Sequence, residues 1–130
     1  MNSADTNLLI RVIVKDDTMQ TALAAAAFEE PIFVSHGVIM ETEWVLRSSY
    51  RLSRDRIVTL LRRLLLHTQT LRMVEPNMIA WCLDRYAAGA DLADMLHIVA
   101  SYGRESFLTF DAKLAASAGS EAPTPVKLLA

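Results

Sequence analysis

The sequence has little of what marks disulfide-bonded or zinc-thiolate proteins. Cys82 is its only cysteine, so an internal disulfide and a zinc site built from cysteines are both excluded. A lone cysteine within the apolar stretch IAWCLDRY, residues 79–86, is typical of a small core residue. Glycine and proline occur four times each, no repeat is found, and the small-residue stretch ASAGSEAPTP is typical of a loop.

Segments that direct a protein to or through a membrane are also missing. No run approaches the roughly 18 uncharged apolar residues that a membrane-spanning helix needs. The stretch MNSADTNLLIRVIV has no basic residues before its apolar run and no small-residue cleavage site after it, so it does not resemble a signal peptide. We therefore expect a cytoplasmic protein without membrane association.

The sequence is rich in apolar residues. Hydrophobic residues make up 52% of the 130 residues, and the mean hydropathy is +0.24. A chain of this length is expected to form one domain, residues 1–130, which buries about two-thirds of its unfolded surface. This apolar content is high for a water-soluble domain, and it predicts that part of the apolar surface contacts a partner chain.

The charge of the chain limits which partners it can bind. The net charge of −2 argues against general affinity for polyanions. Arginines nevertheless gather within residues 47–63, at positions Arg47, Arg51, Arg54, Arg56, Arg62 and Arg63. A basic run of this kind can contact phosphates, but it is more often a solvated helical face with intrahelical ion pairs, and both interpretations stay open.

Helical periodicity dominates the chain, and short apolar runs interrupt it. Apolar residues recur three and four apart in residues 18–30, 53–68, 75–89 and 91–103, each with start and stop signals. Runs of four or five residues lie between or after these helices and are typical of buried parallel strands: PIFVS, LRMVE, SFLTF and PVKLL. The alternation predicts an α/β fold with right-handed crossovers.

Acidic residues lie where such a fold places ligands, at the carboxyl ends of its strands. Asp5 precedes a helix, Glu41 lies about two turns beyond PIFVS, and Asp111 follows SFLTF directly. Asp94 lies one turn into the helix that Asp91 begins, away from the apolar stripe of Leu92, Met95, Leu96 and Val99. Asp91 at the N-cap and Asp94 in the first turn also suit the free N–H groups and the dipole of that helix, so capping remains an alternative.

Two glutamates follow the run PIFVS, and the sequence gives them different explanations. Glu43 has Arg47 four residues later, which predicts an ordinary exposed ion pair. Glu41 has no such partner, and helical spacing places it on one side with Val38 and Val45. It is either a residue at the boundary of the apolar face or a ligand.

If the fold brings these four carboxylates together, their repulsion requires a positive group. A pair of charges 4 Å apart costs on the order of 4 kcal/mol at an effective dielectric constant near 20. Ligands that are all oxygens favour Mg²⁺ or Mn²⁺, and such a site supports phosphodiester hydrolysis by metal-activated water. The chain has no Walker loop, nucleophile elbow, dinucleotide fingerprint or zinc-protease motif that would indicate other chemistry. His97, on the same helix as Asp94, is either a structural residue or one that contacts the metal water or the substrate.

Four segments of the sequence resemble a known family. In order they are ADTNLLIRVIVKDD, VSHGVIMETEWVLRSSY, GADLADMLHIVAS and FLTFDAKLA, and together they resemble the conserved blocks of PIN-domain ribonucleases, specifically VapC-type toxins of toxin–antitoxin pairs. The resemblance covers residues 3–118. It implies a three-layer α/β/α sandwich with a central, mainly parallel sheet of four to five strands, in which MNSA forms the first strand despite its poor strand propensity.

The resemblance also implies the site residues. The acids of the four blocks correspond to Asp5, Glu41, Asp94 and Asp111, and Ser35, six residues earlier, selects Glu41 over Glu43. These acids would bind Mg²⁺ or Mn²⁺ and activate water to cut RNA, with Asp91 as a cap and further candidate ligand. Asn7 and Thr109 would orient the metal-binding acids.

By the same resemblance, the protein would be a homodimer inhibited by a cognate VapB-like antitoxin. Within the basic run, Arg47, Arg51 and Arg54 are candidates for RNA contact. Two alternatives stand beside this interpretation. One is a non-catalytic PIN-like module that binds RNA or an antitoxin, although such a module has no reason to retain four mutually repelling acids. The other is an HAD-like phosphatase, which needs a second aspartate where this chain has Asn7.

Overall fold

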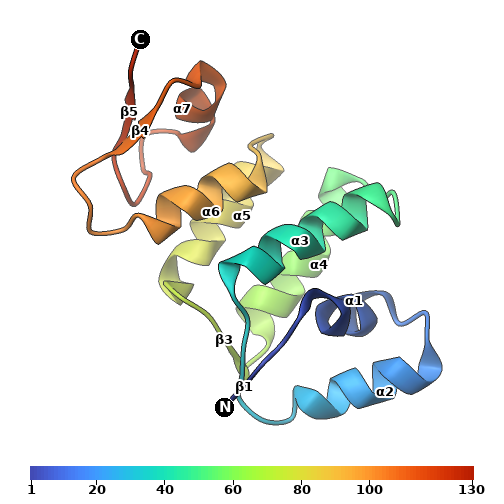
Figure 1. Cartoon of the computed structure of the whole chain (residues 1–130). Helices are drawn as coiled ribbons and strands as arrows, with labels where there is room; N and C mark the ends of the chain where they lie inside the picture. Colours follow the sequence, from blue (N-terminus) through green and yellow to red (C-terminus); the bar gives the residue numbers. More distant parts are fainter. The chain divides into compact units, whose positions relative to one another are not determined.

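Five short parallel strands and eight helical segments make up the structure, a computed structural model that describes residues 1–130 (Figure 1). Contacts within the chain define two units, Met1–Val74 and Glu75–Ala130, and each is described by itself. The α/β fold with parallel strands predicted from the sequence is confirmed.

The first unit is a three-stranded sheet with two helices in each crossover. Its elements are β1 (Asn2–Ser3), α1 (Thr6–Val14), α2 (Thr18–Ala27), β2 (Ile32–Phe33), α3 (His36–Ser48), α4 (Arg54–His67) and β3 (Leu71–Arg72). The strands are ordered β1-β2-β3 and all run parallel, with Ile32 paired to Asn2 on one side and Leu71 on the other. The carboxyl ends of β1 and β2 therefore lead directly into α1 and α3.

Local sequence explains where these helices begin. Asp5, Asp17, Ser35 and Ser53 each stand at an N-cap in extended conformation and accept a hydrogen bond from a backbone N–H of the first turn. The core of the unit includes the fully buried Leu9, Ile39, Leu46 and Leu61, which come from α1, α3 and α4.

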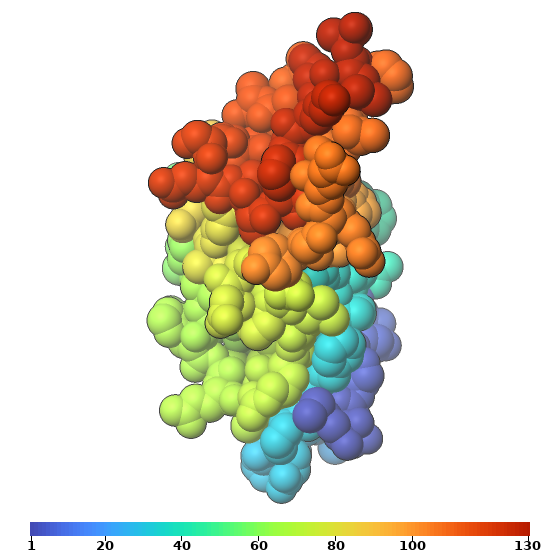
Figure 2. Space-filling model, turned by 90° about the vertical axis from the view of Figure 1, so that its left-hand side faces the viewer, coloured from blue at the N-terminus to red at the C-terminus, as the bar shows by residue number.

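The second unit pairs two helices and a smaller sheet. Its elements are η1 (Pro76–Met78), α5 (Ile79–Ala87), α6 (Leu92–Ala100), β4 (Phe107–Thr109), α7 (Ala112–Ala118) and β5 (Val126–Leu128). Helices α5 and α6 pack together, while α7 connects the parallel strands β4 and β5. Figure 2 shows the residues that follow α6, coloured orange to red, at the surface of this unit.

The buried faces of these two helices agree with the sequence. Leu92, Met95, Leu96 and Val99 are all buried, as the periodicity of α6 predicts. Cys82 is completely buried in α5 and is confirmed as a core residue; burial raises the pKa of its thiol to about 12. Such a thiol is not activated for nucleophilic chemistry.

One feature of the predicted sheet differs from the structure. The expected single sheet of four to five strands is found as a sheet of three strands and a sheet of two. Every predicted strand is present, including β1 within MNSA, but each is only two or three residues long. Strands this short form few backbone hydrogen bonds, and β1 pairs with β2 alone and β4 with β5 alone.

Candidate active site

Asp5 occupies the junction between β1 and α1. Its backbone is extended, and its Oδ1 accepts a hydrogen bond from Leu8 N at 3.1 Å, so it caps α1. The side chain is exposed, and Oδ2 has no hydrogen-bond partner in the protein. The carboxylate thus serves as a helix cap with one oxygen and leaves the other available to a ligand.

Glu41 lies on α3 and is connected to the same junction. Its Oε1 accepts a hydrogen bond from the Thr6 hydroxyl, while Oε2 is unpaired. Thr6 is buried in the first turn of α1, next to Asp5 in the sequence, whereas Glu41 itself is exposed. The hydrogen bond therefore fixes one predicted site acid to the helix that the other one begins.

Thr6 is a site residue that the sequence interpretation missed. Asn7, which was predicted to orient an acid, is exposed and makes no side-chain hydrogen bond in the structure. The signal that could have identified Thr6 is its spacing from Leu9 and Ile10, three and four residues later, which are both buried. A polar residue in such an apolar stripe needs a partner.

The burial of Glu43 differs from the prediction of an exposed ion pair. The predicted pair with Arg47 is present, with Arg47 Nε at 2.9 Å from Oε2 and Nη2 at 3.3 Å from Oε1, but Glu43 is buried rather than exposed. The buried face of α3 consists of Ile39, Thr42, Glu43 and Leu46. This face is turned relative to the expected Val38–Val45 side, so Glu43 points inward and Glu41 outward.

Asp91 and Asp94 stand at the start of α6, in the other unit. Oδ1 of Asp91 accepts a hydrogen bond from Asp94 N at 3.1 Å, which confirms Asp91 as the N-cap. Asp94 is partly buried, and its own carboxylate oxygens have no hydrogen-bond partner. Burial, followed by the negative charges of Asp91 and Asp111, raises the pKa of Asp94, while the nearby His97 acts in the opposite direction.

Asp111 follows β4 and caps α7. Its Oδ1 accepts hydrogen bonds from Lys113 N at 2.9 Å and Leu114 N at 3.1 Å. The backbone N–H of Asp111 donates to Thr109 Oγ1 at 2.9 Å, so Thr109 contacts the predicted site acid through its main chain. Because Asp111 contributes to the raised pKa of Asp94, these two acids act on each other electrostatically.

The four predicted acids share a chemical property. Asp5, Glu41, Asp94 and Asp111 form no ion pair with lysine or arginine, and each retains a carboxylate oxygen without a hydrogen-bond donor. Carboxylate oxygens are ligands that Mg²⁺ and Mn²⁺ prefer, so each of these residues is chemically suited to ligate a divalent cation. The structure itself contains no group of three or more acidic, histidine or cysteine side chains arranged to hold a metal ion.

The predicted RNA-contact arginines differ in their surroundings. Arg47 forms an ion pair with Glu43. Arg51 is exposed and lies in the turn after α3, where its φ is 54°. Arg54 is the exposed first residue of α4. All three belong to the same unit as Asp5 and Glu41.

The chain belongs to the PIN domain family, which it matches over residues 4–120. Members of this family are generally metal-dependent nucleases, and the match supports a nuclease-type, hydrolytic function. No curated protein and no solved structure matches the chain significantly. None of the helices has the length and apolar character that crossing a bilayer requires.

Proposed function

We propose that the chain is a metal-dependent endoribonuclease of the VapC toxin type, a single PIN domain formed from both units. The observation that carries this proposal is the set of four acids without basic partners, each with an open carboxylate oxygen. Asp5, Glu41, Asp94 and Asp111 would hold Mg²⁺ or Mn²⁺, with Asp91 as a further candidate ligand. When bound, the ion would lower the pKa of a water molecule and offset negative charge on the scissile phosphate.

The protein's own contribution is to hold the acids in place. Thr6 restricts the rotamers of Glu41 through its hydrogen bond, and the capping bonds of Asp5 and Asp111 restrict those side chains in the same way. Fixed ligands lose little conformational entropy when a cation binds. Burial and the charges of Asp91 and Asp111 disfavour the ionised form of Asp94, and a bound cation would offset that cost.

The proposed partners are RNA, a second copy of the chain and a VapB-like antitoxin. Exposed apolar side chains support contacts with protein partners, because Trp44 on α3 is 55% exposed and Phe110 after β4 is 83% exposed. Arg47, Arg51 and Arg54 are proposed to contact RNA phosphates. A cytoplasmic location is proposed with these partners, since an antitoxin-controlled ribonuclease has its substrate there.

A cleavage assay tests the enzymatic proposal. Purified protein, freed of any copurifying partner, is incubated with total RNA and Mg²⁺ or Mn²⁺, beside a reaction with EDTA. We expect cleavage that EDTA and Asp94→Asn both abolish. Asp55→Asn, which neutralises an exposed acid on α4, is the matched control and should cleave like the wild type. Cleavage that survives in EDTA would contradict the proposal.

The alternative is a PIN-like module that binds RNA or an antitoxin without cutting. A calorimetric titration with Mn²⁺ distinguishes the nuclease from the binding module. The four acids of a nuclease should bind the ion even when the protein cleaves only a few RNA sequences. Binding that is lost in Asp94→Asn supports the nuclease, and no binding by the wild type favours the module. An HAD-like phosphatase is disfavoured by Asn7 and by the family to which the chain belongs.

A further inference from the structure

A cavity of about 260 Å³ lies between α1 and α2, and Asp5 is part of its wall. The side chains that define it are Asp5, Asn7, Leu8, Arg11, Gln20 and Leu23. Asp5 is the one proposed site acid that the cavity shares. A group that fills this cavity would therefore be a neighbour of whatever that carboxylate binds.

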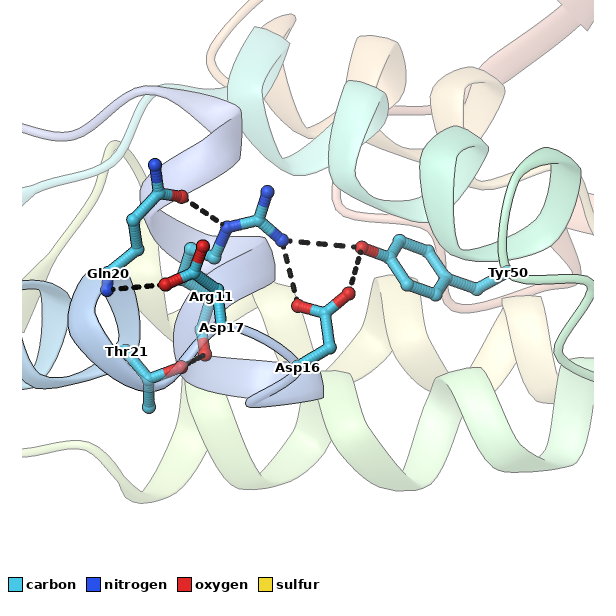
Figure 3. Close-up of polar contacts among 6 residues, drawn as sticks. All are labelled: Arg11, Asp16, Asp17, Gln20, Thr21 and Tyr50. Atoms are coloured by element: carbon cyan, nitrogen blue, oxygen red, sulfur yellow. Dashed lines mark hydrogen bonds and ion pairs between the residues drawn. The ribbon is translucent and has the colours of Figure 1, made fainter.

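Two polar residues of the cavity are held by a hydrogen-bond network (Figure 3). Arg11 Nε donates to Gln20 Oε1 at 2.6 Å, and Arg11 Nη1 donates to Asp16 Oδ1 at 2.8 Å and to the Tyr50 hydroxyl at 3.4 Å. Tyr50 in turn donates to Asp16 Oδ2 at 3.1 Å. The network joins α1, the loop before α2, α2 itself and the turn after α3, so Arg11 and Gln20 are restrained from several sides.

Both residues retain a donor that this network does not use. Arg11 Nη2 and the amide nitrogen of Gln20 make no hydrogen bond within the protein, and neither has a dashed line in Figure 3. Because Asp16 balances the charge of Arg11, this guanidinium offers directional donors rather than a free positive charge. Two fixed donors on neighbouring side chains suit a flat group with two adjacent acceptors.

The rest of the wall is apolar and incompletely covered. Leu8, Leu23 and Ala24 supply it, and Leu23 is 67% exposed. An apolar surface beside paired donors suits the face of a nucleobase, with its polar edge at Arg11 and Gln20. A lone phosphate would use neither the apolar wall nor the neutralised arginine well.

We propose that this cavity binds the base of one unpaired RNA nucleotide next to the scissile phosphate and prefers guanine. The proposal rests on the proposed nuclease function, because Asp5 is shared between cavity and active site. Guanine presents two adjacent acceptors, O6 and N7, to the donors of Arg11 and Gln20. Adenine presents a donor, N6, where guanine has O6, and would face Gln20 donor against donor.

Binding of labelled RNA in EDTA tests the cavity independently of cleavage. The probes are the hexanucleotides UUGUUU and UUAUUU, followed by fluorescence anisotropy. The wild type should prefer the guanine probe by about fivefold or more, which is the lower range for a good paired contact to a base edge. Equal affinities for the two probes, or no binding of either, would overturn the proposal.

Gln20→Glu is the sharpest variant, because glutamate keeps an acceptor for Arg11 Nε and replaces the free donor with a second acceptor. The preference for guanine should be lost and shift towards adenine, whose N6 can donate. Gln69→Glu adds the same charge at an exposed position outside the cavity and should retain the guanine preference. If both variants behave alike, Gln20 does not contact the base.

Leu23→Ala tests the apolar wall, with Met19→Ala on the same helix as its control. Both side chains are exposed, so neither change should affect folding. Leu23→Ala should weaken both probes by about threefold or more, and Met19→Ala should not. Unchanged RNA affinity in Leu23→Ala and Gln20→Glu would assign this face to a protein partner instead. Cleavage of RNA without base preference at the cut would overturn the subsite and leave the nuclease intact.

Discussion

The hydroxyl of Thr6 donates a hydrogen bond to Oε1 of Glu41 and thereby joins the first turn of α1 to the middle of α3, 35 residues later in the chain. Thr6 is buried and Glu41 is exposed, so the buried residue determines where the exposed carboxylate points. In the proposed nuclease, this arrangement makes Thr6 a positioning residue that contacts no substrate.

Replacing Thr6 by valine should separate positioning from folding. Valine has nearly the same shape but cannot donate to Glu41, and loss of a residue that orients a metal ligand typically costs about tenfold or more in activity. We expect RNA cleavage to fall by that factor, while the free energy of unfolding changes by about 1 kcal/mol or less. Thr6→Ser retains the hydroxyl and should restore most of the rate. A Thr6→Val protein with wild-type cleavage would show that Glu41 needs no such support.

Replacement by glutamine should affect cleavage at Glu41 and stability at Glu43. Glu41→Gln should abolish cleavage and leave the unfolding midpoint near that of the wild type, because the side chain is exposed. Glu43→Gln should lower the free energy of unfolding by about 1–3 kcal/mol, since it weakens a buried, charged contact with Arg47. Its cleavage rate, measured on the folded fraction, should be largely retained. The reverse pattern in cleavage and urea unfolding would assign the metal-binding role to Glu43.

The sequence predicted the elements of the fold better than their assembly. Helix starts were readable because Asp91, Ser53 and other caps act within one turn, and the buried stripe of α6 followed from its spacing. The burial of Glu43 was not readable, because Glu41 and Glu43 each lie beside apolar residues of α3, and the sequence alone does not decide which of the two apolar sides packs inward. The division of the strands into two sheets depends on hydrogen bonds between residues far apart in the chain.

The candidate site shows the same limit. The resemblance of the four blocks predicted Asp5, Glu41, Asp94 and Asp111 as site residues, but the Thr6–Glu41 contact depends on how α1 packs against α3. The cavity beside Asp5 is formed by α1 and α2 together, and the free donors of Arg11 and Gln20 depend on side-chain rotamers. Neither follows from a pattern in the sequence.

Arg51 and Arg54 should contribute to RNA binding through charge. Both are exposed, so the double variant Arg51→Gln/Arg54→Gln should fold normally and bind RNA more weakly. Each lost phosphate contact should reduce the slope of log affinity against log salt by about 0.7 for single-stranded RNA. Arg104→Gln/Lys127→Gln removes the same charge from exposed positions of the other unit and is the matched control. Identical salt slopes for both double variants would exclude a specific contribution from the basic segment.

Asp94→Asn should stabilise the metal-free protein at neutral pH. Burial and the charges of Asp91 and Asp111 raise the pKa of Asp94 in the folded state, so ionisation there is less favourable than in the unfolded chain. The wild type therefore loses stability as pH rises above the ordinary range of an aspartate, and the loss is complete above the raised pKa. Asparagine carries no charge and removes this loss.

The gain should remain below about 1 kcal/mol, because water still reaches part of the carboxyl group. It should disappear as pH falls below the ordinary pKa of aspartate, where both states are protonated. Thermal unfolding in EDTA across this pH range measures it, with Asp55→Asn as the control for loss of a carboxylate. A stabilisation that is equal at all pH values would assign the effect to something other than ionisation. A destabilisation at neutral pH would show that the Asp94 carboxylate contributes to folding as well as to the proposed metal site.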